Sequence, residues 1–264
     1  MKKENLILAG RLWLEGVVLF ALRLVHLRTG FDADTGLALP SLAGRAVWIG
    51  LLVCLAAEAA LCVRRPGNSK RSYACCFRIL EGPALGVLTA GCFLLIAGGI
   101  LLLLPVLPPQ GAAEVTAAAA GALGIAGGAG LLLLAKELRS GDAPTVFPLL
   151  AAMFFSVLFL LAVYFPEESN PVLERYYLPV LGAAMAAYFL YQLSGLIRGE
   201  GNLRWFGLIA DFAAVTCVAA AADCLDNPGH LMVYLGFAAV ITAFLLLLRK
   251  EPLPEPEEAE EDAA

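Results

Sequence analysis

Eight long apolar segments alternate with short polar stretches along this sequence. They cover residues 6–26, 46–63, 84–105, 113–135, 146–165, 176–197, 205–223 and 231–248. A helix of about 20 apolar residues crosses the hydrocarbon core of a bilayer, which is about 30 Å thick. The pattern therefore predicts an all-α, polytopic integral membrane protein, a bundle of eight transmembrane helices.

The first segment differs from the others because Arg11, Glu15 and Arg23 interrupt it. A charge at the centre of an inserting helix costs about 2.5–3.5 kcal/mol, whereas each Leu, Ile, Phe or Val contributes only about 0.3–0.6 kcal/mol in favour. Segment 6–26 therefore needs partner helices in the membrane. The same charges argue against a cleavable signal peptide.

Basic residues gather on alternate sides of the predicted spans. Thirteen fall at the N-terminus, in the even-numbered connections and after the last span, namely Lys2, Lys3, Arg64, Arg65, Lys70, Arg71, Arg78, Lys136, Arg139, Arg198, Arg204, Arg249 and Lys250. The opposite side has only Arg28, Arg45 and Arg175. Lys and Arg concentrate on the cytoplasmic face of membrane proteins, so we expect both termini in the cytoplasm and the protein in the cell membrane.

Composition excludes several classes of protein. The chain is 60% hydrophobic and 16% charged, far from the balance of a soluble domain, and we expect no nucleic-acid binding. Its net charge of −5 arises from residues 251–264, which hold seven acids and no base. We therefore predict one transmembrane domain over residues 1–250, followed by a disordered acidic cytoplasmic tail at 251–264.

The basic connection at 64–81 is a candidate contact for anionic lipid. Its second half, from Ser72 to Glu81, is amphipathic, with Phe77, Ile79 and Leu80 beside basic residues. Such a segment can lie along the inner surface of a bilayer. We therefore expect the lipid bilayer itself, and anionic lipid at this loop, as partners.

Signatures of catalysis are missing. The sequence has no GxSxG, HExxH, GxxxxGK[ST] or GxGxxG motif, so we expect no enzyme and no cofactor. His26 and His230 fall near Asp223 and Asp226 at the predicted outer boundary, where imidazole and carboxylate could bind a metal. Polar residues at helix ends are ordinary, however, and we predict no metal site.

Buried charge is the strongest functional signal. At a rise of about 1.5 Å per residue, Arg11, Glu58, Gln192 and Asp211 fall at similar depths in the inner half of four spans. Glu15 lies one turn above Arg11. Ionisable residues inside a membrane are costly and often functional, so these five residues form the candidate binding site.

The charges in this candidate site do not balance. One arginine faces three acids, so the site must take up a proton or a cation if it is held at low dielectric. The leading hypothesis is a small permease or transporter-like protein with a proton- or cation-linked site, or one for a small cationic solute. The alternatives are a non-catalytic membrane sensor or assembly protein, in which these residues join helices, and lastly a membrane-embedded lipid-modifying enzyme. In either of the first two cases, Arg11→Leu is expected to be the most damaging single change.

Overall fold

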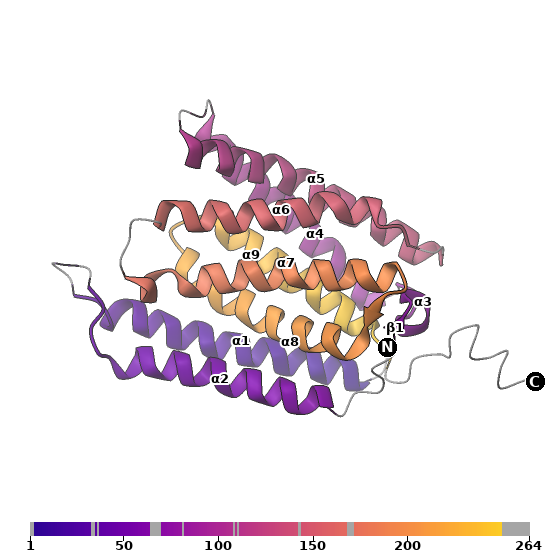
Figure 1. Cartoon of the computed structure of the whole chain (residues 1–264), viewed down its shortest axis with the longest axis horizontal. Helices are drawn as coiled ribbons and strands as arrows, with labels where there is room; N and C mark the ends of the chain where they lie inside the picture. Colours follow the sequence, from indigo (N-terminus) through magenta and orange to yellow (C-terminus); the bar gives the residue numbers. More distant parts are fainter. Residues whose placement is uncertain are drawn as a thin grey trace, which may run out of the picture.

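The computed structural model describes residues 3–32, 35, 37–63, 70–80, 82–107, 109, 111–141, 144–167 and 172–249. The predicted acidic tail at 251–264 and residues 64–69 of the basic connection lie outside the described residues. Within that part of the chain, eight long helices pack side by side in one bundle (Figure 1). They are α1 (Lys3–Thr29), α2 (Leu42–Val63), α4 (Gly82–Leu103), α5 (Ala112–Ser140), α6 (Phe147–Tyr164), α7 (Tyr177–Ile197), α8 (Leu203–Ala220) and α9 (Pro228–Leu247).

The predicted apolar segments coincide with these helices, with ends that differ by a few residues. Seven of the eight, all but α1, are long and apolar enough to cross a membrane. Helix α1 has the length, 27 residues, but it carries Arg11, Glu15 and Arg23. The prediction of an all-α, multi-pass membrane bundle is confirmed, while the placement of α1 across the membrane stays a prediction.

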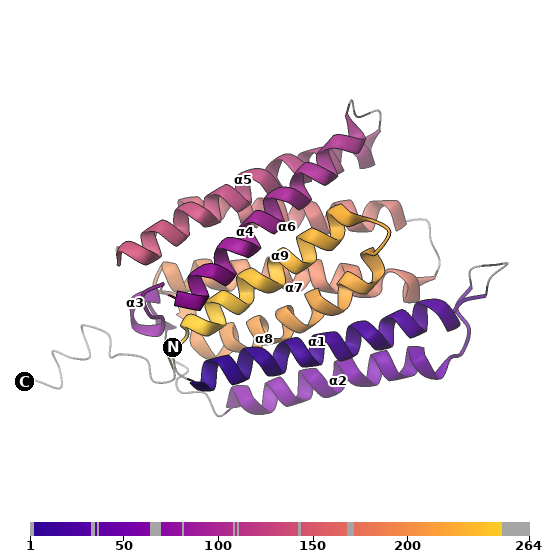
Figure 2. The same cartoon turned by 180° about the vertical axis from the view of Figure 1, so that it is seen from behind.

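The helix ends define two ends of the bundle. Helix α1 begins and α9 ends at one of them, here called the proximal end (Figures 1 and 2). Helix α1 ends, and α7 and α9 begin, at the other, here called the distal end. That the proximal end faces the cytoplasm stays a prediction from the basic residues.

Short elements connect the long helices. At the proximal end, β1 (Lys70–Arg71) pairs antiparallel with β2 (Gly201–Asn202), and α3 (Tyr73–Cys76) follows β1. Single turns of 3-10 helix extend or connect the others: η1 (Leu104–Val106), η2 (Phe165–Glu167), η3 (Leu173–Arg175) and η4 (Ala221–Cys224).

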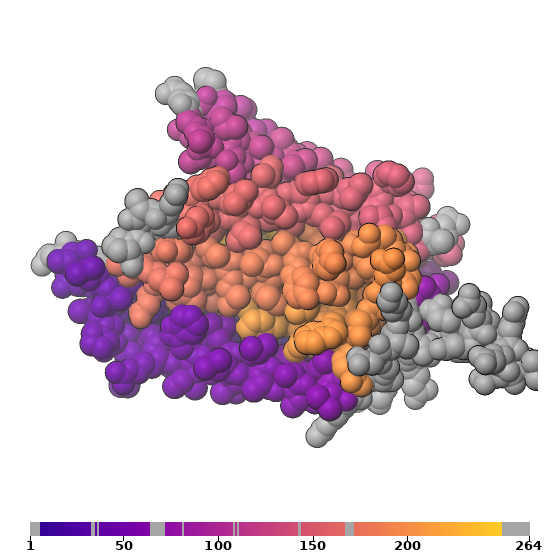
Figure 3. Space-filling view, in the orientation of Figure 1, coloured from indigo at the N-terminus to yellow at the C-terminus, as the bar shows by residue number. Residues whose placement is uncertain are grey.

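Helices α8 and α9 form the centre of the bundle. Most of their residues are buried, whereas α2 exposes most of its surface. Helices α1 and α2 pack on one side of α8, and α4, α5 and α6 extend the bundle on the other, with α6 and α7 lying between α5 and α2 on one face (Figure 3). Outward-facing side chains such as Leu52, Val53 and Phe154 are apolar and exposed. Apolar exposure on this scale fits contact with lipid chains.

Glycines bring α4 and α5 into backbone contact. A Cβ atom added to Gly99 would lie 2.7 Å from the carbonyl oxygen of Gly121, and one added to Gly121 would lie 2.7 Å from that of Gly99. Small residues allow this approach, which stabilises helix pairs in lipid. The Ala- and Gly-rich helix α5 therefore serves close packing at the edge of the bundle, between α4 and α6.

The segment that follows β1 packs several of its apolar side chains into the protein, and the contact of this loop with anionic lipid stays a prediction. Tyr73, Cys76, Phe77 and Leu80 are buried, and the Phe77 ring packs edge-on against Phe206 of α8 and Phe244 of α9. Backbone hydrogen bonds join the segment to the ends of α5 and α9. Its apolar side chains thus close the proximal end, because the ends of α8 and α9 offer them a protein surface to bury against.

Candidate functional site

Arg11 and Glu58 form an ion pair between α1 and α2. The Arg11 Nη2 donates to Glu58 Oε1 at 2.5 Å, and Arg11 Nε lies 3.5 Å from Glu15 Oε1. Glu58 is completely buried, while 30% of the Arg11 side chain and 23% of the Glu15 side chain remain exposed. Three of the five predicted site residues therefore meet directly.

Asp211 belongs to the same electrostatic group, and Gln192 lies elsewhere. Asp211, buried on α8, acts on the Arg11 charge together with Glu58 and Glu15. Gln192 on α7 instead lines an open cavity of about 290 Å³ at the proximal end, beside Tyr191 and Trp205. Gln192 was predicted to belong to the site because it lies at the same depth as the other four residues. Depth along a helix does not determine which neighbouring helix a side chain faces.

The carboxyl groups of Glu15 and Glu58 lack enough donors. Glu15 and Glu58 share the Arg11 guanidinium, which lies 3.5 Å from Glu15 Oε1 and 2.5 Å from Glu58 Oε1. Among the described residues, Oε2 of Glu15 and Oε2 of Glu58 are buried without a hydrogen-bond partner. Ionised carboxylates only accept hydrogen bonds, so two of them beside one guanidinium need a proton or a further cation. We call Arg11, Glu15, Glu58 and Asp211 the proximal cluster.

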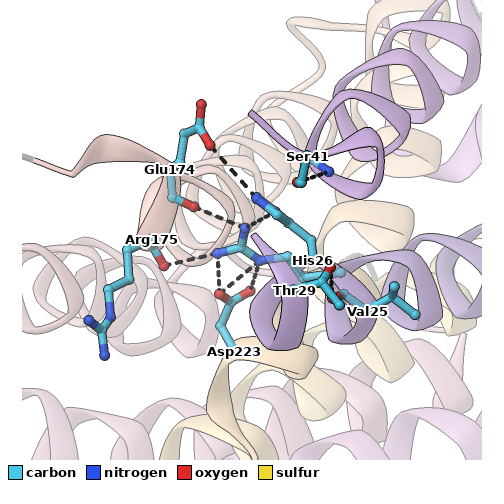
Figure 4. Close-up of polar contacts among 9 residues, drawn as sticks. Val25, His26, Thr29, Ser41, Glu174, Arg175 and Asp223 are labelled. Carbon is cyan, nitrogen blue, oxygen red and sulfur yellow. Dashed lines mark hydrogen bonds and ion pairs between the residues drawn. The ribbon is translucent and has the colours of Figure 1, made fainter. Parts of the chain in front are cut away.

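A second and more extensive polar group lies at the distal end, where Arg23 of α1 contacts His26, Glu174, Arg175 and Asp223, the last four labelled in Figure 4. The completely buried Arg23 guanidinium holds the Asp223 carboxylate through Nε at 2.9 and 3.0 Å and through Nη2 at 2.5 Å. Its Nη1 and Nη2 also donate to the main-chain carbonyls of Glu174 and Arg175, both at 2.9 Å. One guanidinium thus joins α1, η3 and η4, and we call this group the distal cluster.

His26 completes the distal cluster in a defined tautomer. Its Nδ1 lies 2.9 Å from Arg23 Nη1, and a guanidinium only donates, so Nδ1 must be the acceptor. The ring proton therefore sits on Nε2, which points toward Glu174 Oε2 at 3.7 Å. Gly44 packs so closely on the ring that an added Cβ would lie 2.8 Å from Nε2.

An open cavity of about 710 Å³ adjoins the distal cluster. It is lined by the end of α1, the turns around η3 and η4, and the start of α9. Its polar lining includes Arg28, Arg175, Tyr176, Asp223, Asp226, Asn227 and His230. Within the described part of the chain, no group of three His, Cys, Asp or Glu residues could hold a metal ion. His26 is buried in the protein, and His230 lines the cavity.

The distal cluster was missed by reasoning from the sequence alone. The sequence identifies Arg23 only as a charge within segment 6–26, and Asp223 only as a polar residue at the end of a helix. The available signal was depth, since Arg23 and Asp223 are opposite charges near the same predicted boundary. Pairing charges by depth at both ends of the spans would have joined them.

Comparison with protein-family models, with curated proteins and with solved structures found no match for this chain.

Proposed function

We propose that this protein is a small carrier of the cell membrane, linked to protons, in which the proximal cluster is the proton-binding site. The observation that carries this proposal is that the Glu15 and Glu58 carboxyls lie against one guanidinium, that of Arg11, and that each keeps a buried oxygen without a hydrogen-bond partner among the described residues. A buried pair of acids with one cation is stable when it also holds a proton. A proton suits the site better than a metal ion because no three metal ligands gather among the described residues.

Proton release from this site would act on helix positions. Glu15 lies on α1 and Glu58 on α2. When the proton leaves, two carboxylates from the two helices lie beside one guanidinium and repel. The repulsion favours a different position of α1 relative to α2. A change in proton occupancy is thereby coupled to a change in the bundle, which is what a proton-linked carrier requires.

The experiment uses the full chain in proteoliposomes that contain a trapped pH indicator. A panel of amino acids, amines and inorganic cations is added outside, and solute-driven proton movement is recorded. We expect at least one solute to drive proton movement in the wild-type protein. Glu58→Gln should abolish it, whereas the matched control Glu114→Gln, an exposed acid at the start of α5, should retain it.

Two outcomes would contradict the proposal. Equal proton movement in Glu58→Gln and the wild type would remove Glu58 from coupling. A correctly inserted wild-type protein that moves no proton with any solute of the panel would favour the sensor or assembly hypothesis, in which the proximal cluster joins helices.

A further inference from the structure

We infer that the distal cavity binds a small amino carboxylate, a solute that carries carboxylate groups and an ammonium group. The inference names a class of solute for the proposed carrier. Transport of that solute depends on the proposed function, whereas its binding to the cavity does not. Charged residues line this cavity, and one of them, Asp223, is already paired with Arg23.

The cavity presents two guanidinium groups and one carboxylate to a solute. Asp223, although part of the lining, is held by three hydrogen bonds from Arg23 and is neutralised. Arg28, Arg175 and Asp226 remain, and all three are exposed. Arginine binds carboxylates through paired donors, and an aspartate accepts from an ammonium group. A solute with both groups complements this lining.

The position of the arginines is unusual for a membrane protein. Arg28 and Arg175 are two of the three basic residues that the chain places on this side of its predicted spans. Basic residues are depleted on the side opposite the cytoplasm. Their convergence on one cavity indicates a role for their charge at this place, whereas the third, Arg45, does not line the cavity.

Hydrogen bonds hold the main chain on two walls of the cavity. The main-chain carbonyl of Arg175 accepts from Arg23 Nη2 at 2.9 Å, so the buried guanidinium sets the position of the main chain at Arg175. On the other wall, Asn227 Oδ1 accepts from the backbone N–H of His230 at 3.2 Å at the start of α9. A site with a preformed lining loses less free energy to ordering when it binds.

Size and apolar lining suit a small organic solute. The volume of about 710 Å³ falls in the range of about 300–1,000 Å³ that is typical of small-molecule sites. Leu24, Leu27 and Leu225 line the same cavity and can contact the carbon chain of the solute. The cavity thus combines charged groups for orientation with apolar contact, as such sites usually do.

The test measures equilibrium binding of L-glutamate, L-alanine, glutarate and ethylamine to the purified full-length protein by titration calorimetry. We expect the amino acids to bind, glutarate to bind more weakly than L-glutamate, and ethylamine not to bind. Arg28→Gln and Arg175→Gln should each weaken binding about tenfold or more. Asp226→Asn should remove the preference for L-glutamate over glutarate.

Arg45→Gln is the matched control, because Arg45 lies at the same end but outside the cavity, and it should bind as the wild type does. Equal weakening in Arg45→Gln would overturn the inference in favour of general surface charge. Two results with the wild-type protein alone would also overturn the inference. They are the absence of saturable binding by all four solutes and equal binding of L-glutamate and ethylamine. Binding that persists in a protein without solute-driven proton movement would overturn the carrier and keep this site.

Discussion

At the scale of single residues, burial and partners separate the two arginines of α1. Arg11 is partly exposed and pairs with Glu58 and Glu15. Arg23 is completely buried and holds Asp223, His26 and two main-chain carbonyls. From the sequence, Arg11→Leu was expected to be the most damaging change. The structure predicts instead that a change at Arg23 is the most damaging, because removing the Arg23 guanidinium leaves a buried carboxylate and two main-chain carbonyls without their donor.

We therefore predict that Arg23→Leu lowers the free energy of unfolding by about 3–5 kcal/mol, the usual cost of breaking a buried ion pair. Arg23→Lys should recover only part of the loss, because an ammonium group cannot reproduce the fork of donors. Thermal unfolding of the purified protein measures both, with Arg45→Leu as an exposed control. An Arg23→Leu protein that unfolds with the control would show that the distal cluster contributes nothing to stability.

At the scale of helices, the apolar pattern predicted every long element, because lipid-facing and buried side chains are both apolar in a membrane bundle. It did not predict the β1–β2 pair or the inward packing of Phe77 and Leu80. Those features depend on which helix ends lie nearby in the folded bundle, and the order of apolar residues along the chain does not predict these neighbours. The sequence also predicts the depth of Gln192 and Asp211, but not the direction in which each side chain points around α7 and α8. In the structure, Asp211 belongs to the proximal cluster and Gln192 lines a different cavity.

Close packing of α4 on α5 gives a test at this scale. We predict that Gly99→Ala lowers the melting temperature, because its added methyl group would meet the backbone of Gly121 at 2.7 Å. Gly86→Ala in the same helix should be neutral or slightly stabilising, since nothing lies within 4 Å of an added Cβ and alanine favours a helix over glycine by about 0.5–1 kcal/mol. Equal melting temperatures for the two variants would contradict the backbone contact.

At the scale of the whole molecule, charged contacts hold α1 near both of its ends. The proximal ion pair joins α1 to α2, and the distal cluster joins α1 to the turns before α7 and after α8. Apolar packing in lipid gives little preference for one helix neighbour over another. We infer that these polar contacts determine where the charged helix α1 lies.

A double-mutant cycle on Arg11→Leu and Glu58→Leu measures the proximal link. Each single change removes the Arg11–Glu58 ion pair and leaves the other member in place, so the double variant should be more stable than the sum of the single losses implies. We expect a coupling energy between the average of about 0.6 kcal/mol for polar contacts in membranes and about 3 kcal/mol for buried pairs. Additive losses would mean that the 2.5 Å contact does not stabilise the fold.

The central claim is that the Glu15 and Glu58 pair holds a proton, and infrared titration tests it most directly. The wild-type protein should show the C=O stretch of a protonated carboxyl at neutral pH, and the band should disappear as the pH rises. Glu58→Gln and Glu15→Gln should each remove or shift the band, and Glu114→Gln should leave it unchanged. A wild-type spectrum without a protonated carboxyl, or a band that both buried-site variants retain unchanged, would contradict the account.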